Sequence, residues 1–573
     1  MICENCDKSI CKNKISYLSL DVNYCDYCEE ISKKIGRIVE ESQLIYKRNI
    51  FKDILNLNIN DNKILNEYIK RKNILTKQLD TKDKILNILY QIIGILTDDI
   101  VSIIQENPSA YLIVGLSLLE YNSFLSIQIV DIIHNFNKKE YKEYDNDDLA
   151  ILISKMFVDF RRRNEEIAKD VFGEIQKIIT LDKHAFQYAI KIIEKNVLEN
   201  KKSRTLFEKT NIDDLKIENI LKLVRVYSNL YDLSEAYLNG IYNIKNLSTD
   251  SNGINIEYEE DEFEYNYSKL INILSSQSIS SKLPISFTEE VDDVINKYLG
   301  VTTGKIDNAL KNLFETYREG NDILIGTDNS FIQLFAKIFE IDNFKAKKLV
   351  NIFTLNYKNI DYTWINERPL KKCLLRFSNE ILCVPLSILG YTITNFRATI
   401  LSNKMINESF DKEIQALNKK LNDKFELDVG NMIKSNFRNS NINVNVEQKD
   451  IISKDNKQNV VLTGEIDVLA FIEGYVFVVE CKDFELRIDF EEFRNELRYM
   501  RKAQKKLSPK IDIINANLQY VLEYLGVDES QLKSKKVQGI IVTSQFSIAD
   551  FWKKSKYPIV NAKNLIEFIK KYL

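Results

Sequence analysis

Two apolar runs separated by only two residues constrain the fold of this chain more than any other feature. The runs cover residues 466–472 and 475–479, and Glu473 and Gly474 lie between them. Both runs are rich in β-branched and aromatic residues, as strands are. A connection of two residues between such runs predicts a tight β-hairpin.

This hairpin determines which charged residues meet. Counting outward from the turn, Ile472 pairs with Tyr475. The same register places Asp467 opposite Glu480, and opposed residues in an antiparallel pair have Cβ atoms about 5 Å apart on one face. Side chains alternate along a strand, so Lys482 projects on the same face as Glu480.

Two carboxylates this close repel each other unless a cation lies between them. Mg²⁺ meets that need because it is typically held by one or two carboxylates, water molecules and a substrate phosphate. The sequence therefore predicts a Mg²⁺ or Mn²⁺ site at Asp467 and Glu480. Lys482 would orient or activate the attacking water and offset the charge that builds up on the phosphate.

Residues 421–573 resemble the PD-(D/E)XK, or restriction-endonuclease-like, nuclease superfamily. Its motif is an Asp followed further along the chain by Glu/Asp-x-Lys, which Asp467 and Glu480-Cys481-Lys482 match. The sequence GEIDVLAF…VFVVECK is similar to the corresponding segments of the Mrr-like and archaeal Holliday-junction-resolvase-like branches. Those branches carry an acid on the preceding helix, and Glu426 in KFELDVGNMI matches it. The proline of the nominal motif is absent, since Ile466 precedes Asp467.

The resemblance implies an α/β domain with a small mixed central sheet flanked by helices. We expect strands within 444–453, 464–472, 475–483 and 537–544, and a closing helix in 561–573. The implied activity is Mg²⁺-dependent hydrolysis of phosphodiester bonds by a DNA endonuclease. Its catalytic residues would be Asp467, Glu480, Lys482 and Glu426, with the three acids also binding the metal. A role in restriction or antiviral defence is an expectation by analogy alone.

Residues 494–510 predict a basic helix after the hairpin. Most of its basic residues would share one broad face, which could contact phosphates without reading sequence, or could simply be a solvated surface. Some branches place a Gln or a basic residue on this helix, which Gln504 and Lys505 match loosely. The predicted nucleic-acid-binding residues are Arg498, Arg501, Lys502, Gln504 and Lys505, and the same stretch carries Arg494, Lys506 and Lys510.

A cysteine-rich segment, residues 1–30, is set apart from the rest. Cys3-x-x-Cys6 and Cys25-x-x-Cys28 flank residues 7–24, a spacing typical of a structural Zn²⁺ site with four thiolate ligands. Iron in a similar site and free thiols are the alternatives. Cys11 would be a spare thiol or an alternative ligand. The module could bind DNA or protein, or only cap the chain.

The remaining residues predict a large all-α region, so the chain is expected to be multidomain. The whole chain has only six prolines and 16 glycines, which favours long helices. We expect helices in 31–245, an acidic and serine-rich linker or loop in 246–286, and a second helical region in 287–420. The acidic segment could instead be a nucleic-acid mimic or a regulatory flap. Residues 370–389 could form a β-hairpin or two short helices.

Composition excludes several function classes. A net charge of −3 argues against nucleic-acid binding by the protein as a whole, so contact must come from local basic patches. The two histidines, His134 and His184, receive no role, and their scarcity argues against HNH nucleases and Ser–His hydrolases. No secretory signal is visible, and apolar stretches such as 111–119 are shorter than the roughly 20 residues that span a membrane. We therefore expect a cytoplasmic protein without membrane contact.

Two other function classes stay open. The chain could be a nucleic-acid-binding or scaffold protein whose nuclease fold is silent. It could also be a protein-interaction module in which residues 30–420 bind a protein partner or a second copy, with an accessory nuclease. Cleavage by the wild type, or a stable complex formed without the C-terminal domain, would separate these alternatives.

Overall fold

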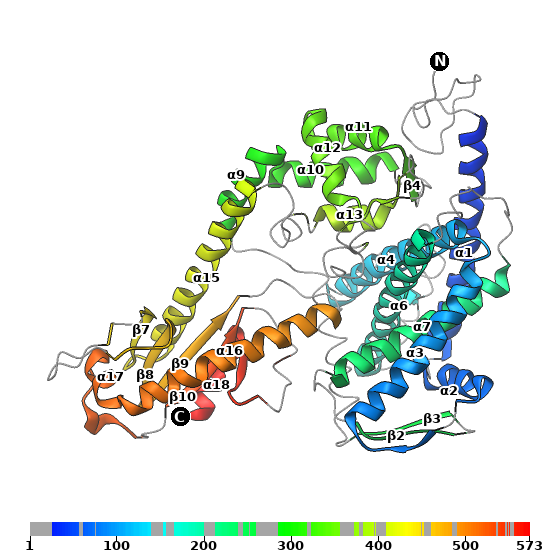
Figure 1. Cartoon of the computed structure of the whole chain (residues 1–573). Coiled ribbons are helices and arrows are strands. Elements are labelled where there is room, and N and C mark those ends of the chain that lie inside the picture. Colours follow the sequence, from blue (N-terminus) through cyan, green and yellow to red (C-terminus); the bar gives the residue numbers. More distant parts are fainter. Residues whose placement is uncertain are drawn as a thin grey trace. The chain divides into compact units, whose positions relative to one another are not determined.

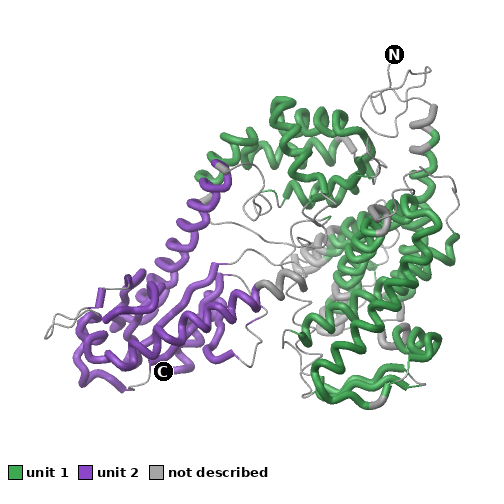
Figure 2. Tube along the Cα trace, in the orientation of Figure 1, with its two compact units in different colours: residues 1–238, 242–279, 288–407 green, residues 239–241, 280–287, 408–573 purple. Residues whose placement is uncertain are grey.

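The protein is described here by a computed structural model. It describes residues 26–56, 61–74, 76–138, 153–155, 165–199, 213–238, 244–250, 253–258, 285–317, 323–355, 369, 372–376, 382–394, 396, 408–447, 450–451, 460–483, 490–533, 537–544, 547, 549 and 555–573. The chain is mostly helical and divides into two compact units (Figures 1 and 2). The helical unit comprises Met1–Leu238, Tyr242–Ile279 and Thr288–Asn407, and the C-terminal unit comprises Asn239–Ile241, Ser280–Phe287 and Glu408–Leu573.

Long helices dominate the first part of the helical unit. Their bounds are α1 Asp26–Asn56, α2 Asp61–Lys72, α3 Lys82–Ile104, α4 Pro108–Lys138, α6 Glu165–Glu199 and α7 Asp214–Leu238. In α3 the apolar residues recur at three- and four-residue spacing, and Ile85, Leu89, Ile92 and Leu96 are fully buried. Within the described residues, α3 is also the one helix long and apolar enough to cross a membrane, a test that core helices of soluble proteins pass as well.

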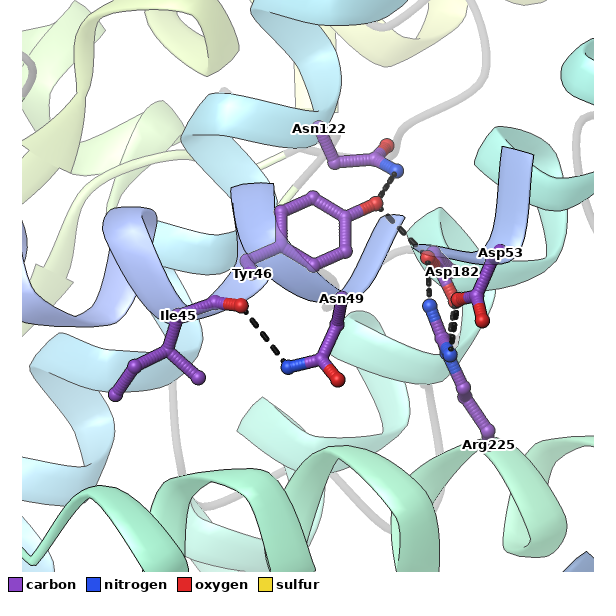
Figure 3. A network of polar contacts seen from close by, with 7 residues as sticks. All are labelled: Ile45, Tyr46, Asn49, Asp53, Asn122, Asp182 and Arg225. Atoms are coloured by element: carbon purple, nitrogen blue, oxygen red, sulfur yellow. Dashed lines mark hydrogen bonds and ion pairs between the residues drawn. The ribbon is translucent and has the colours of Figure 1, made fainter. Parts of the chain in front are cut away.

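A buried polar network ties four of these helices together (Figure 3). The Arg225 guanidinium of α7 donates to both carboxylate oxygens of Asp182 in α6, at 2.6 and 2.7 Å, and to Asp53 of α1 at 2.8 Å. Tyr46 donates to Asp182, and Asn122 of α4 donates to the Tyr46 hydroxyl, each at 2.9 Å. Buried charges are tolerated when they are paired and hydrogen-bonded in this way.

The second part of the helical unit contains shorter helices. These are α9 Ile285–Leu299, which begins in the C-terminal unit, and α10 Thr303–Tyr317, α11 Asp328–Phe339, α12 Asn343–Phe353 and α13 Leu386–Thr394. Thr327 and Asp342 cap α11 and α12 by accepting a hydrogen bond from the backbone three residues on.

The prediction of an all-α region is wrong, because the helical unit also holds two three-stranded sheets. One has the order β1-β2-β3, with bounds Thr76–Leu79, Ile244–Asp250 and Gly253–Tyr258. The predicted linker at 246–286 is therefore wrong for residues 246–250 and 253–258. The buried residues of β2 are Ile244, Leu247 and Thr249, and a register shift between Ile244 and Asn246 breaks the alternation that would mark a strand in the sequence. Residues 259–284 lie outside the described part.

The second sheet has the order β4-β6-β5, with bounds Ile323–Gly326, Leu382–Pro385 and Leu375–Arg376. Strands β5 and β6 pair antiparallel, so the β alternative for residues 370–389 is confirmed over these residues. The second apolar run then continues directly into helix α13.

The C-terminal unit is a five-stranded mixed sheet flanked by helices. The strands are β7 Asn441–Val446, β8 Ile466–Ile472, β9 Tyr475–Lys482, β10 Gln538–Thr543 and β11 Ile559–Asn561, in the order β11-β10-β9-β8-β7. The pairs β7–β8 and β8–β9 are antiparallel, whereas β9–β10 and β10–β11 are parallel. The helices are α15 Glu408–Asn436, α16 Phe490–Ala516, α17 Leu518–Leu525 and α18 Leu565–Tyr572, with short 3-10 turns at Glu529–Gln531 and Ala562–Asn564.

Helices cover both faces of this sheet. On one face, Val429 and Ile433 of α15 and Leu565 of α18 form a core with alternate strand residues. On the other face α16 lies close to β10 (Figure 1), where a Cβ on Gly539 would come within 2.3 Å of Ile511. Only glycine leaves room for the helix at that point. Central strand β9, covered on both sides, is accordingly apolar except at its carboxyl end.

The predicted mixed sheet is confirmed, with differences at its edges. Strand β7 begins at Asn441, before the predicted 444–453, and the short strand β11 was not predicted. Helix α15 begins at Glu408, so the expected domain boundary at residue 421 falls inside a helix. The cysteine module also falls largely outside the described part, which begins at Asp26; of its cysteines only Cys28 lies on the described backbone, in α1.

Candidate functional site

The hairpin has the predicted turn and register. Glu473 and Gly474 both have positive φ, 46° and 95°, which suits a two-residue turn between right-twisted strands. Ile472 pairs with Tyr475, and the ladder continues outward to Val468 and Val479. The next residues along the two strands are Asp467 and Glu480.

The two carboxylates are buried at the end of the hairpin. Asp467 is 8% exposed and Glu480 is 3% exposed. The backbone N–H of Cys481 donates to Oδ2 of Asp467 at 2.6 Å, which fixes the Asp467 side chain against β9. The structure thus brings together the acids that the register predicts.

Lys482 joins the same cluster. Its Nζ lies 2.8 Å from Oε1 of Glu480 and 3.9 Å from Oδ2 of Asp467. Nζ also donates to the carbonyl oxygen of Cys481 at 2.7 Å. The ammonium therefore lies between the two acids, with 27% of the side chain exposed.

A second lysine enters the site from α16. Nζ of Lys510 donates to Oε2 of Glu480 at 2.6 Å, and its side chain is only 6% exposed. The sequence placed Lys510 in the basic stretch, most of whose residues were expected to share one exposed face, but gave it no role in the acid cluster. The residue lies in the apolar stripe of α16, three residues after Leu507 and next to Ile511, both of which are buried. A lysine at a stripe position was the sequence signal that could have revealed it.

Glu426 approaches the site from α15. Burial, then the negative charges of Asp467 and Glu465, raise the pKa of Glu426 to about 7. Lys482 acts in the opposite direction on the same carboxyl. The mutual electrostatic influence of Glu426, Asp467 and Lys482 places all three predicted groups in one neighbourhood.

The pKa values of the two hairpin acids shift in opposite directions. Burial and the charge of Glu480 raise the pKa of Asp467 to about 6. Burial also opposes ionisation of Glu480, but Lys482 and Lys510 outweigh it and lower the pKa of that carboxyl. Glu480 is thus ionised and held by the two lysines. Asp467 and Glu426, in contrast, repel each other.

The donor set suits a hard divalent cation. Carboxylate oxygens are the ligands that Mg²⁺ and Mn²⁺ prefer. The raised pKa values of Asp467 and Glu426 reflect burial first and then repulsion from neighbouring acids, and a cation would relieve that repulsion. Over the described ranges, no group of three or more His, Cys, Asp or Glu side chains is already arranged to hold an ion. In this arrangement ammonium groups occupy both oxygens of Glu480.

The exposed side of α16 carries most of the other predicted residues. Arg498, Arg501, Lys502 and Lys505 are exposed there, and Lys502 lies over the exposed ring of Tyr499. Gln504 instead donates to Ser555 at 2.5 Å and accepts from the backbone of Lys556 at 3.1 Å. The Gln504 side chain therefore holds a neighbouring loop.

The predicted zinc ligands Cys3, Cys6 and Cys25 lie outside the described residues, and so does the side chain of Cys28. Cys481, between the two key residues of β9, is a buried thiol. Burial, then the charge of Asp467, raises its pKa well above the usual range, which makes a thiolate ligand there unfavourable.

Known proteins offer no independent assignment of this site. No protein-family model matches the chain, and no curated protein or solved structure is detectably similar to it.

Proposed function

We propose that this chain is a divalent-cation-dependent nuclease of the PD-(D/E)XK type that hydrolyses phosphodiester bonds, with DNA as its substrate. One observation carries the proposal: Asp467, Glu480 and Lys482 converge at the end of a central hairpin, with Glu426 electrostatically coupled to them. Carboxylates beside an ammonium at the end of a covered strand suit in-line attack of water on a phosphate.

The three acids and the lysine have different roles in this reaction. Asp467, Glu480 and Glu426 would hold Mg²⁺ or Mn²⁺. When bound, the cation would neutralise phosphate charge and favour ionisation of the attacking water. Lys482, which lies between the acids, would hydrogen-bond that water and the phosphate oxygens. The water oxygen bonds to phosphorus, the phosphorus–oxygen ester bond breaks, and the leaving oxygen takes up a proton.

The exposed basic side of α16 supports a nucleic-acid substrate. Arg498, Arg501, Lys502 and Lys505 belong to the same helix that brings Lys510 to Glu480, so phosphate contacts and the acid cluster share one element. Such contacts are independent of sequence and weaken with salt. We further propose a cytoplasmic location and a structural Zn²⁺ site at the N-terminal cysteines.

A cleavage assay tests the proposal. Full-length protein is incubated with supercoiled plasmid, linear DNA or RNA in Mg²⁺, Mn²⁺ or EDTA, beside Asp467→Ala and Lys482→Ala. We expect cation-dependent cutting that falls by at least about 100-fold in both variants. Asp428→Ala removes an exposed acid from the same helix as Glu426 and should cut normally.

DNA binding is measured in parallel, in EDTA. Wild-type protein that binds DNA but cuts no substrate with either cation would favour the silent binding protein. Cutting that persists in Asp467→Ala would place the chemistry elsewhere and defeat the assignment of this site.

A further inference from the structure

Lys510 differs from the basic residues that α16 exposes. Arg501, Lys505 and Lys506 are exposed, whereas Lys510 is 5% exposed and belongs to the buried stripe with Leu507 and Ile511. Its stem passes the segment that leads into β8, since its Cε lies 3.9 Å from where a Cβ on Gly464 would be. Burying a lysine is costly unless its charge is paired, so the partner of this ammonium matters.

The partner of the Lys510 ammonium is a carboxylate oxygen of Glu480, which is a proposed ligand of the cation. Nζ of Lys510 lies 2.6 Å from Oε2 of Glu480, and Nζ of Lys482 lies 2.8 Å from Oε1. Mg²⁺ bonds carboxylate oxygens at about 2.0–2.1 Å, and it does so in the space where an ammonium hydrogen otherwise points. Two positive partners on one carboxylate oxygen repel each other, so Lys510 and a divalent cation compete for Oε2.

Charge adds to this competition. When all five groups are ionised, Glu426, Asp467 and Glu480 exceed Lys482 and Lys510 by one negative charge. Without Lys510 the excess is two, and a divalent cation is attracted more strongly. Lys510 thus opposes cation binding through its contact with Oε2 and through its charge.

We propose that Lys510 is a positioning residue that acts as a built-in competitor for the divalent cation at Glu480. In the cation-free protein it holds the Glu480 carboxylate in place. When a cation is bound, Lys510 yields Oε2, and its ammonium becomes available to a phosphate oxygen of the nucleic-acid substrate. Weak cation binding without substrate is the consequence. This inference rests on the proposed function, because it assumes that Glu480 is a cation ligand.

Mn²⁺ binding to the full chain tests the idea without any measure of activity. Free Mn²⁺ is quantified by electron paramagnetic resonance during titration of wild type, Lys510→Met and Lys510→Arg. We expect Lys510→Met to bind Mn²⁺ about tenfold more tightly. Lys510→Arg keeps the charge and should remain close to wild type. Lys506→Met removes an exposed lysine four residues away on the same helix and should change nothing.

The outcomes separate the inference from the function on which it rests. Equal or weaker Mn²⁺ binding in Lys510→Met, with Asp467→Ala still abolishing binding, would overturn the competitor role and leave the cation site intact. Absence of Mn²⁺ binding in the wild type and in every variant would instead remove the cation site itself. A purely structural Lys510 would lower the thermal midpoint and weaken binding, the opposite of the expected gain.

Discussion

At the scale of single residues, the site is a balance between burial and charge. Glu480 is ionised because two ammonium groups contact it, whereas burial and neighbouring negative charge raise the pKa values of Asp467 and of the half-buried Glu426 despite the opposing charge of Lys482. Perturbed carboxyls of this kind cluster where proteins bind cations or transfer protons. The perturbation also has a consequence for stability, because a shifted pKa links folding to pH.

Glu426→Gln should reveal this link in cation-free protein. The pKa of Glu426 rises from 4.5 to about 7 on folding, so its contribution to stability is full below pH 4.5 and is lost as pH rises through 7. Glutamine does not ionise. We expect similar thermal midpoints for wild type and variant at pH 5 in EDTA, and a midpoint a few degrees higher for the variant at pH 8.5.

The matched control for this comparison is Asp428→Asn, an exposed acid on the same helix, which should track wild type at both pH values. Added Mn²⁺ should then stabilise wild type more than Glu426→Gln, since a ligand stabilises the state that binds it. Midpoints of wild type and Glu426→Gln that stay parallel from pH 5 to 8.5 would contradict the burial and repulsion described for Glu426.

At the scale of elements, the β8–β9 hairpin shows how far sequence reasoning reaches. Two adjacent residues, Glu473 and Gly474, determine its register, and the register brings Asp467 to Glu480. Lys510 was not predicted because it is 30 residues from Glu480, and the side of α16 that meets the sheet depends on packing. Strand β11 was missed because Ile559–Asn561 is too short to show a period.

Substitutions in the turn should change stability in opposite directions. Gly474 has a φ of 95°, and a Cβ there would lie 2.5 Å from Cγ of Lys533. Gly474→Ala should therefore cost about 1–2 kcal/mol or more. Glu473 is exposed with a φ of 46°, and asparagine is favoured in that conformation before glycine, so Glu473→Asn should stabilise the hairpin.

Thermal unfolding of the two variants, followed by circular dichroism, measures these changes. Each variant serves as the control for the other, because both positions belong to one turn and neither touches the acid cluster. A midpoint for Gly474→Ala equal to that of wild type would mean that the turn does not have the positive φ described here.

At the scale of the whole molecule, two units have separate cores. The C-terminal core is formed by residues of α15, the sheet and α18, while the helical unit has its own apolar interior and the Arg225 network. The sequence predicted long helices and a separate C-terminal α/β part. It offered β5 and β6 only as one of two alternatives, and it could not reveal the sheet of β1, β2 and β3, because these strands are short and β1 pairs with a strand more than a hundred residues away.

Arg225→Met tests whether the helical unit unfolds by itself. The variant leaves the buried Asp182, and the partly exposed Asp53, without their cation, and breaking a buried pair in this way costs about 3–5 kcal/mol. We expect calorimetry of the full chain to show one transition that moves several degrees lower. A second transition, the one that Mn²⁺ raises in wild type, should keep its position because the cation site lies in the other unit.

Lys245→Met is the matched control, because it breaks an ion pair with the same N–O distance as the Arg225–Asp182 pair but with exposed side chains. The Lys245–Glu257 pair and the Arg225–Asp182 pair both have N–O distances of 2.6 Å, but the first has side chains 58% and 52% exposed, and the second 12% and 3%. Water and salt screen the exposed pair, so its loss should leave both transitions in place. If Arg225→Met shifts both transitions equally, the two units unfold together, and the division by contacts does not describe how the chain is stabilised.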